Sequence, residues 1–233
     1  MPTAVVTPTF NEASNVAVLV RRLLDTRTFR SDPQARILVV DDGSPDGTAE
    51  VAEQAGAGRV RVIRRGRRQG LASAYREGLE AALEAGFDPV VQMDADLSHD
   101  PADVDRLVET DGDLVLGTRW MDGGGSEGWP LARRWLSRAG TRYVRFWLGL
   151  PQHDLTGGFK AWRASCLRAV DLRSVRSEGY VFQVETTWRA VLAGFQVAEV
   201  PIVFARRASG TSKLSARIAL EAAWRIPTFR WQR

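Results

Sequence analysis

Two aspartates separated by one residue follow directly after an apolar segment of the chain. Asp94 and Asp96 come after Val90 and Val91, where a buried β-strand is expected to end. Alternate side chains of an extended segment point the same way, so both carboxylates can approach one cation. Adjacent carboxylates repel each other unless a metal ion or a proton lies between them. The pair therefore predicts a site for a divalent metal ion.

A second acidic turn, VVDDGSPDGT at 39–48, lies upstream and also follows an expected strand. Asp-Gly and Pro-Asp-Gly sequences are common turn formers, so a purely structural role for Asp42 and Asp46 stays open. The carboxyl ends of parallel strands meet at one edge of a sheet, where such folds bind their ligands. Two acidic strand ends therefore indicate a phosphate ligand bridged by Mg²⁺ or Mn²⁺, which prefer oxygen ligands, whereas zinc usually takes histidine or cysteine.

The hydrophobic pattern of the first half alternates between short strands and amphipathic helices. We expect strands at 4–7, 37–40, 60–63, 90–93 and 114–117, and helices at 16–24, 48–55 and 71–83. Asn11 or Ser14 is expected to cap the first helix, and Pro101 to begin the helix after the acidic pair. Strands joined by helical crossovers predict an α/β fold with a mostly parallel sheet and three layers.

The composition is that of an ordinary globular protein. The 233 residues are 44% hydrophobic and 26% charged, with a net charge of +4, and only Lys160 and Lys213 among the basic residues are lysines. The single cysteine, Cys166, excludes an internal disulfide and suits a reducing compartment. No signal segment and no apolar stretch long enough to span a bilayer is recognised, so we expect a cytoplasmic protein that is soluble or peripheral.

A glycine-rich segment at 123–128 separates this half from an expected helix at 131–148. That helix mixes arginines with large apolar side chains: Arg133, Arg134, Trp135, Leu136, Arg138, Arg142, Tyr143, Val144, Arg145, Phe146, Trp147 and Leu148. Such a mixture is typical of a helix at a membrane interface, with Trp135, Phe146 and Trp147 entering the headgroup region. The alternative is a core helix with one solvated face. Nucleic-acid binding is disfavoured because no nucleic-acid motif accompanies the arginines.

Together these segments resemble a known family. TPTFNE at 7–12, VVDDGSPDGT at 39–48 and MDADLSHDP at 93–101 resemble the nucleotide-sugar domain of glycosyltransferase family 2. The second half is similar to the dolichol-phosphate (polyprenol-phosphate) mannose synthases, through GTR at 117–119, Arg133, Ser137, DLTGGFK at 154–160, GYVFQVE at 179–185, EVP at 199–201 and RASGTSK at 207–213. The resemblance covers nearly the whole chain.

The resemblance implies a role for each matching residue. The nucleoside and donor pocket would comprise Pro8, Phe10, Asn11, Glu12, Asp41, Gly70, Leu71, Asp94 and Ala95, with Phe10 standing where tyrosine is common. The metal ligands would be Asp94 and Asp96, with Ser98 at a position where some members carry a glutamine ligand. The acceptor phosphate would contact Arg119, Arg133, Ser137 and Arg207. Lys213 would face the donor diphosphate, and Asp96, Lys213 and the arginines would be the catalytic residues.

The implied enzyme is a single GT-A catalytic domain over residues 1–233, with a nucleotide-sugar and metal half (1–119) and an acceptor and membrane-surface half (120–233). It would transfer mannose from GDP-mannose to a polyprenyl phosphate at the cytoplasmic face of a membrane. A phosphate monoester is already ionised at neutral pH and needs no general base. Glu185 is a candidate base, although its helical pattern favours a structural role. Direct displacement would invert the anomeric centre.

Three alternatives remain at this point. The donor could be UDP-glucose or another UDP-sugar, because nucleoside choice depends on pocket contacts that the sequence does not display. A non-catalytic sugar-nucleotide or lipid-binding module is disfavoured by the intact aspartates and arginines. A dinucleotide-binding dehydrogenase is disfavoured because no G-x-G-x-x-G follows the first strand. The resemblance leaves open whether a membrane-anchored partner protein is needed.

Overall fold

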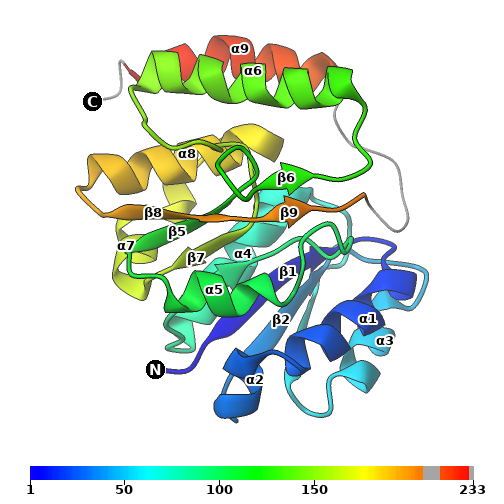
Figure 1. Cartoon of the computed structure of the whole chain (residues 1–233). Coiled ribbons are helices and arrows are strands. Elements are labelled where there is room, and N and C mark those ends of the chain that lie inside the picture. The colour runs from blue at the N-terminus through cyan, green and yellow to red at the C-terminus, as the bar shows by residue number, and fades with distance from the viewer. Residues whose placement is uncertain (207–215, 231–233) are drawn as a thin grey trace.

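A mixed β-sheet lies at the centre of the molecule (Figure 1). The computed structural model describes residues 1–206 and 216–230. In this part the sheet has seven strands in the order β3-β2-β1-β4-β7-β5-β8. Their bounds are β1 (Ala4–Thr9), β2 (Arg36–Asp41), β3 (Val60–Arg64), β4 (Val90–Gln92), β5 (Leu114–Thr118), β7 (Lys160–Trp162) and β8 (Val197–Pro201). All neighbours are parallel except β7, which is antiparallel to β4 and β5.

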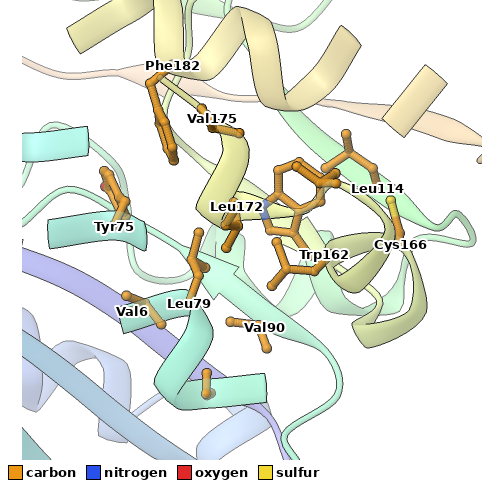
Figure 2. Close-up of a cluster of buried hydrophobic side chains, with 14 of the residues drawn as sticks. Val6, Tyr75, Leu79, Val90, Leu114, Trp162, Cys166, Leu172, Val175 and Phe182 are labelled. Carbon is orange, nitrogen blue, oxygen red and sulfur yellow. The ribbon is translucent and has the colours of Figure 1, made fainter. Parts of the chain in front are cut away.

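Helices cover both faces of the sheet, which confirms the predicted three-layer α/β fold. Alternate side chains of the buried strands point to opposite faces, so Val5 and Val6 belong to different hydrophobic clusters. The Val5 face packs against α1 (Ala13–Leu24), α2 (Arg27–Ser31), α3 (Thr48–Ala55) and α5 (Asp103–Glu109). The Val6 face packs against α4 (Leu71–Glu84), α7 (Ala164–Ala169), the short 3₁₀ turn η1 (Leu172–Ser174) and α8 (Gly179–Leu192). Figure 2 shows this second cluster around Trp162.

A further layer lies over α8. Helices α6 (Leu131–Leu148) and α9 (Ala216–Phe229) lie side by side there (Figure 1). Their inner faces form a third hydrophobic cluster with α8, which includes Val144, Leu148 and Ile226. Two short strands, β6 (Gly125–Ser126) and β9 (Val203–Phe204), pair in parallel; β6 precedes α6 in the chain and β9 precedes α9. The predicted helix 131–148 is thus confirmed with the same bounds.

The two interpretations of α6 each describe one side of it. Trp135 and Phe146 are 68% and 77% exposed, as an interfacial helix requires. Trp147, however, is only partly exposed and packs against the third cluster, with its ring 6.3 Å from that of Tyr143. Trp147 thus lies on the packed side of the helix, and this position favours a structural role for it over the predicted entry into a membrane.

Two predicted helix starts differ from the structure. The N-cap of α1 is Glu12, with no capping bond from its own side chain. The carboxylate of Asp46 instead accepts a hydrogen bond from the backbone N–H of Ala13 (3.1 Å), across the loop between β2 and α3. Helix α5 begins at Asp103, two residues after Pro101, because residues 101–102 form a turn.

Candidate active site

The acidic pair lies directly after β4, at the carboxyl edge of the sheet. Asp94 and Asp96 line a cavity of about 290 Å³, which we call the acidic cavity. Its other lining residues are Pro8, Glu12, Leu71, Ala95, Thr156, Gly158, Glu178, Gly179, Tyr180 and Gln183. Of the two predicted acidic strand ends, the one after β4 lines this cavity, where it meets Pro8 and Glu12 from the end of β1 and the loop that follows; no residue of the acidic turn after β2 lines it.

A tyrosine that the motifs did not indicate holds the first aspartate. The hydroxyl of Tyr75, on α4, donates a hydrogen bond to Asp94 Oδ1 (2.6 Å). Tyr75 is fully buried, and its ring lies parallel to that of Phe182 at 6.3 Å. Burial and the charge of Asp94 raise the pKa of Tyr75 well above its ordinary value. The phenol therefore keeps its proton and remains a donor to Asp94. From the sequence, Tyr75 is simply one of the apolar positions of its helix.

The residues of the acidic cavity fit a hard divalent cation. The site offers two carboxylates, and nowhere in the described residues do three or more His, Cys, Asp or Glu side chains form a group that could hold a metal ion. Two carboxylates alone match the way Mg²⁺ and related ions are bound, with water and substrate phosphate oxygens completing the coordination. Ser98 does not join them as predicted. It is fully buried outside the cavity lining, and its backbone N–H donates to Asp96 Oδ1 (3.0 Å), so it orients the carboxylate.

The second acidic turn is mainly structural. Asp41 is buried, and its oxygens accept bonds from Thr9 Oγ1 (2.9 Å), from the backbone of Gly43 and from the backbone and hydroxyl of Ser44. It lies outside the lining of the acidic cavity, because these bonds turn its carboxylate into the loop. The contact of Asp41 with a nucleoside stays a prediction.

Its neighbour Asp42 fixes a more distant loop. Asp42 forms a buried ion pair with Arg65 (2.6 Å) and accepts hydrogen bonds from the backbone of Gln69 and Gly70. Gly70 precedes α4 with a φ of 94°, which favours glycine. A Cβ at Gly70 would lie 3.6 Å from Glu178, which lines the acidic cavity, so Gly70 stands behind the rim of the cavity.

A second cavity adjoins the first. It has a volume of about 420 Å³ and lies between α6, α8 and α9; we call it the apolar cavity. Apolar groups dominate its lining, with Leu136, Val144, Val181, Val184 and Ile226 among them. Arg119, Arg133 and Ser137 line it as well, so the structure brings together the described part of the predicted acceptor set. Thr156 and Tyr180 line both cavities, which places the acidic and apolar cavities side by side.

Arg119 is held by a buried carboxylate. Its Nε and Nη2 donate to the two oxygens of Asp154 (2.6 and 2.9 Å), and Nη2 also donates to Thr156 Oγ1 (3.0 Å). Burial alone would raise the pKa of Asp154, but Arg119 lowers it below its ordinary value. Burial opposes the charge of Arg119, yet Asp154 raises the pKa of this arginine overall. Both groups are therefore charged, and the side chain of Arg119 is held against the loop at 154–158.

A buried lysine lies behind the acidic cavity. Lys160 Nζ donates to the carbonyl oxygen of Gln183 (2.7 Å) and to the hydroxyls of Thr187 (3.0 Å) and Thr186 (3.2 Å). Burial lowers its pKa to about 7. The side chain of Gln183, which lines the cavity, accepts a bond from Gln92 Nε2 (2.8 Å). In the sequence this residue stood out as the last residue of the DLTGGFK motif and as one of two lysines in an arginine-rich chain.

The remaining predicted residues fall into three groups. Phe10 and Asn11 follow Pro8 but lie outside the cavity lining; the ring of Phe10 carries the guanidinium of Arg68 at 4.5 Å. Glu185 is buried and bonded to Ser177 and to Arg189 (2.6 Å), which suits the structural role that its pattern favoured. Arg207 and Lys213 lie outside the described residues, so their roles stay predictions.

Comparison with known proteins identifies close relatives. The family described as glycosyl transferase family 2 matches residues 4–170. The chain is 42% identical over 230 residues to a polyprenol monophosphomannose synthase of Mycolicibacterium smegmatis, covering 96% of this chain and 85% of that protein. It is also 42% identical over 228 residues to an undecaprenyl-phosphate mannosyltransferase of Micrococcus luteus, covering 96% of this chain and 91% of that protein.

Solved structures share the fold at lower identity. The glucosyl-3-phosphoglycerate synthase of Mycobacterium tuberculosis, in complex with Mn²⁺, UDP-glucose and phosphoglyceric acid, matches with a TM-score of 0.68 and 21% identity. The match covers 97% of this chain and 80% of that chain. At this identity the likeness establishes the fold of the chain and nothing finer.

Proposed function

Because the chain belongs to glycosyl transferase family 2, we propose that it transfers mannose from GDP-mannose to a polyprenyl phosphate with inversion at the anomeric carbon. The observation that carries this proposal is the pair of adjoining cavities. One is lined by Asp94 and Asp96 and suits a metal-bound nucleotide diphosphate; the other is apolar, with arginines in its wall, and suits an isoprenoid phosphate. The names of the two relatives at 42% identity support mannose as the sugar and a polyprenyl phosphate as the acceptor.

The reaction needs no general base from the protein. A phosphate oxygen of the acceptor attacks the anomeric carbon, the bond from this carbon to the diphosphate oxygen breaks, and GDP leaves with the electron pair. The acceptor phosphate has a second pKa near 6. It is therefore largely dianionic at neutral pH, and its attack requires no general base. Glu185, the candidate base in the sequence, is bonded to Ser177 and Arg189.

Asp94 and Asp96 would hold the metal ion, Mg²⁺ or Mn²⁺. When bound, the ion offsets the charge that develops on the departing diphosphate. The chain's contribution is to fix both carboxylates before substrate arrives. Tyr75 donates to Asp94 (2.6 Å), and the backbone of Ser98 donates to Asp96 (3.0 Å). Pro8, Glu12, Leu71 and Ala95 complete the donor side of the cavity.

The acceptor would meet the donor where Thr156 and Tyr180 separate the two cavities. Arg119 and Arg133 would draw the anionic headgroup toward an already anionic donor, through charge-assisted hydrogen bonds. Ser137 lies one turn after Arg133 on α6 and lines the same cavity. The first isoprene units would then occupy the apolar lining, where burial of hydrocarbon is favourable.

The same surface would lie on a membrane. Leu136 lines the apolar cavity and is 57% exposed, so the cavity reaches the surface beside the exposed side chains of Leu131 and Trp135. Trp224 on α9 is 65% exposed and belongs to the same layer. Within the described residues, no helix combines the length and apolar character that crossing a bilayer requires. From the exposed apolar side chains we infer peripheral attachment to a membrane, which we propose is at its cytoplasmic face, with α6 contacting the headgroups.

Donor preference distinguishes this proposal from its alternatives. The purified chain is heated with Mn²⁺ and either GDP-mannose or UDP-glucose, and the shift in melting temperature is recorded. Each donor is then incubated with enzyme and polyprenyl phosphate, and the lipid product is identified by mass spectrometry. We expect stabilisation by GDP-mannose and a mannosylated lipid phosphate. If only UDP-glucose stabilises the chain and gives product, the donor is UDP-glucose and not GDP-mannose. Binding of a donor without any product would indicate a non-catalytic module.

A further inference from the structure

Arginine and tryptophan side chains alternate along the loop and helix beside the apolar cavity. The order is Arg138, Trp120, Arg119, Trp129, Arg133. The distances from guanidinium carbon to ring centroid are 4.9 Å from Arg138 to Trp120, 5.3 Å from Arg119 to each ring, and 3.9 Å from Arg133 to Trp129. An arginine within about 6 Å of an aromatic face is attracted to it. Each tryptophan therefore contacts two guanidinium groups.

Trp129 has the central position in this series. It lines the apolar cavity together with Arg119 and Arg133. Its ring also meets that of Phe204 edge-on at 5.3 Å, which ties it to β9. Trp129 directly precedes Pro130, the N-cap of α6, so its position is coupled to the start of the helix that carries Arg133.

The tryptophan rings separate arginine side chains that carry the same charge. Guanidinium groups gathered at one wall repel each other, and a neutral ring between them offers each a favourable contact instead. Stacking uses the face of a guanidinium group and leaves its N–H edge for an anion. Arg119 is already fixed by Asp154, whereas the shortest of the four ring contacts belongs to Arg133. The close contact with Trp129 therefore restricts where the guanidinium group of Arg133 can lie.

We propose that Trp129 is a positioning residue for the acceptor phosphate. Its ring holds Arg133 beside Arg119, so that an N–H edge of Arg133 is directed at the phosphate monoester of an isoprenoid in the apolar cavity. This inference rests on the proposed function, because it assumes that the apolar cavity takes the acceptor. It predicts that loss of the ring weakens acceptor binding through Arg133 and leaves the donor site unaffected.

The test is a calorimetric titration with farnesyl phosphate, which needs no turnover, on the whole chain. Trp129→Leu keeps an apolar side chain and removes the ring; we expect affinity to fall on the order of tenfold. Trp129→Phe keeps a ring face and should stay within about threefold of the wild type. In an Arg133→Ala background, Trp129→Leu should have little further effect, because the residue through which it acts is gone. Independent, multiplying losses would overturn the inference and indicate direct contact with the lipid tail.

Two controls separate positioning from damage. Mn²⁺-dependent binding of GDP should be unchanged in Trp129→Leu, whereas a general loss of structure would weaken it and lower the melting temperature. If Trp129→Leu does not fold, Trp129→Met takes its place. Phe10→Leu removes the guanidinium–aromatic contact with Arg68 near the donor side and should leave farnesyl phosphate binding intact. Wild type that fails to bind farnesyl phosphate would contradict the proposed function itself; wild-type binding that Trp129→Leu leaves unchanged would overturn only the inference on Trp129.

Discussion

Replacing Asp154 with asparagine removes the negative member of a buried ion pair. The side chains of Arg119 and Asp154 are 6% and 0% exposed, and the contact is bidentate. Removal of one partner leaves an uncompensated charge in the interior, which typically costs about 3–5 kcal/mol. Asparagine retains one acceptor oxygen, so we expect a loss near the lower value, about 3 kcal/mol. For a chain of this length, that corresponds to a fall in Tm of roughly 6–12 °C.

The loss should also depend on pH. The pKa of Asp154 is lowered in the folded chain, so its carboxylate contributes stability above its unfolded pKa of about 3.9. This contribution disappears as the pH falls through the folded pKa. The difference between wild type and Asp154→Asn should therefore be full at pH 7 and should narrow only in strong acid.

Urea unfolding and thermal melts at neutral pH measure this effect. Asp100→Asn is the matched control, because the Arg22–Asp100 pair has side chains 47% and 49% exposed. An exposed pair contributes about 0–1 kcal/mol, so the control should melt close to wild type. If Asp154→Asn is no more destabilised than Asp100→Asn, Asp154 does not hold Arg119 in the lining of the apolar cavity as we describe.

Three further outcomes are expected. Tyr75→Phe removes the hydrogen bond to Asp94 and should weaken Mn²⁺ binding in the presence of GDP about tenfold, measured by calorimetry, with the fold intact by circular dichroism. The unfolding free energy of the wild type should rise from pH 7 toward 10, because Lys160 keeps its proton there in the unfolded chain but has released it in the folded chain, where its pKa is about 7. In Lys160→Met the slope of unfolding free energy against pH should be smaller by up to about 1.4 kcal/mol per pH unit. A Trp135→Ser/Phe146→Ser double variant should lose binding to anionic liposomes while melting like wild type, since both side chains are exposed; equal liposome binding by the two proteins would count against the membrane contact.

Most of the sheet could be predicted from the sequence because its parallel strands are buried apolar runs. The five strands of the first half were found this way, with bounds that differ by at most two residues at either end. Strand β7 was missed because it has only three residues and starts with a lysine. Strand β8 was missed because Glu199 interrupts its apolar pattern. It is an edge strand with mostly half-buried residues, so its side chains need not all be apolar.

The candidate site was predictable where a motif follows a strand. Asp94 and Asp96 could be placed at the sheet edge because they follow a buried apolar strand, whereas Pro8 and Arg119 were indicated only by the family resemblance. The supporting residues could not be predicted, because their roles depend on contacts between distant segments. Tyr75 reaches Asp94 from α4, and Trp129 belongs to a loop with no pattern of its own. Ser98 shows the opposite error, since its position in the motif did not reveal that its hydroxyl is buried away from the cavity.

The most direct test of the account is the product of a single reaction. Enzyme, GDP-mannose, Mn²⁺ and a polyprenyl phosphate are incubated together, and the lipid fraction is analysed by mass spectrometry and by the configuration of its anomeric carbon. We expect a mannosyl phosphate of the lipid with the configuration inverted relative to the donor. We also expect no product from Asp96→Ala, whose fold is verified by circular dichroism. Retained configuration, or full product formation by Asp96→Ala or in the presence of EDTA, would contradict the proposed function.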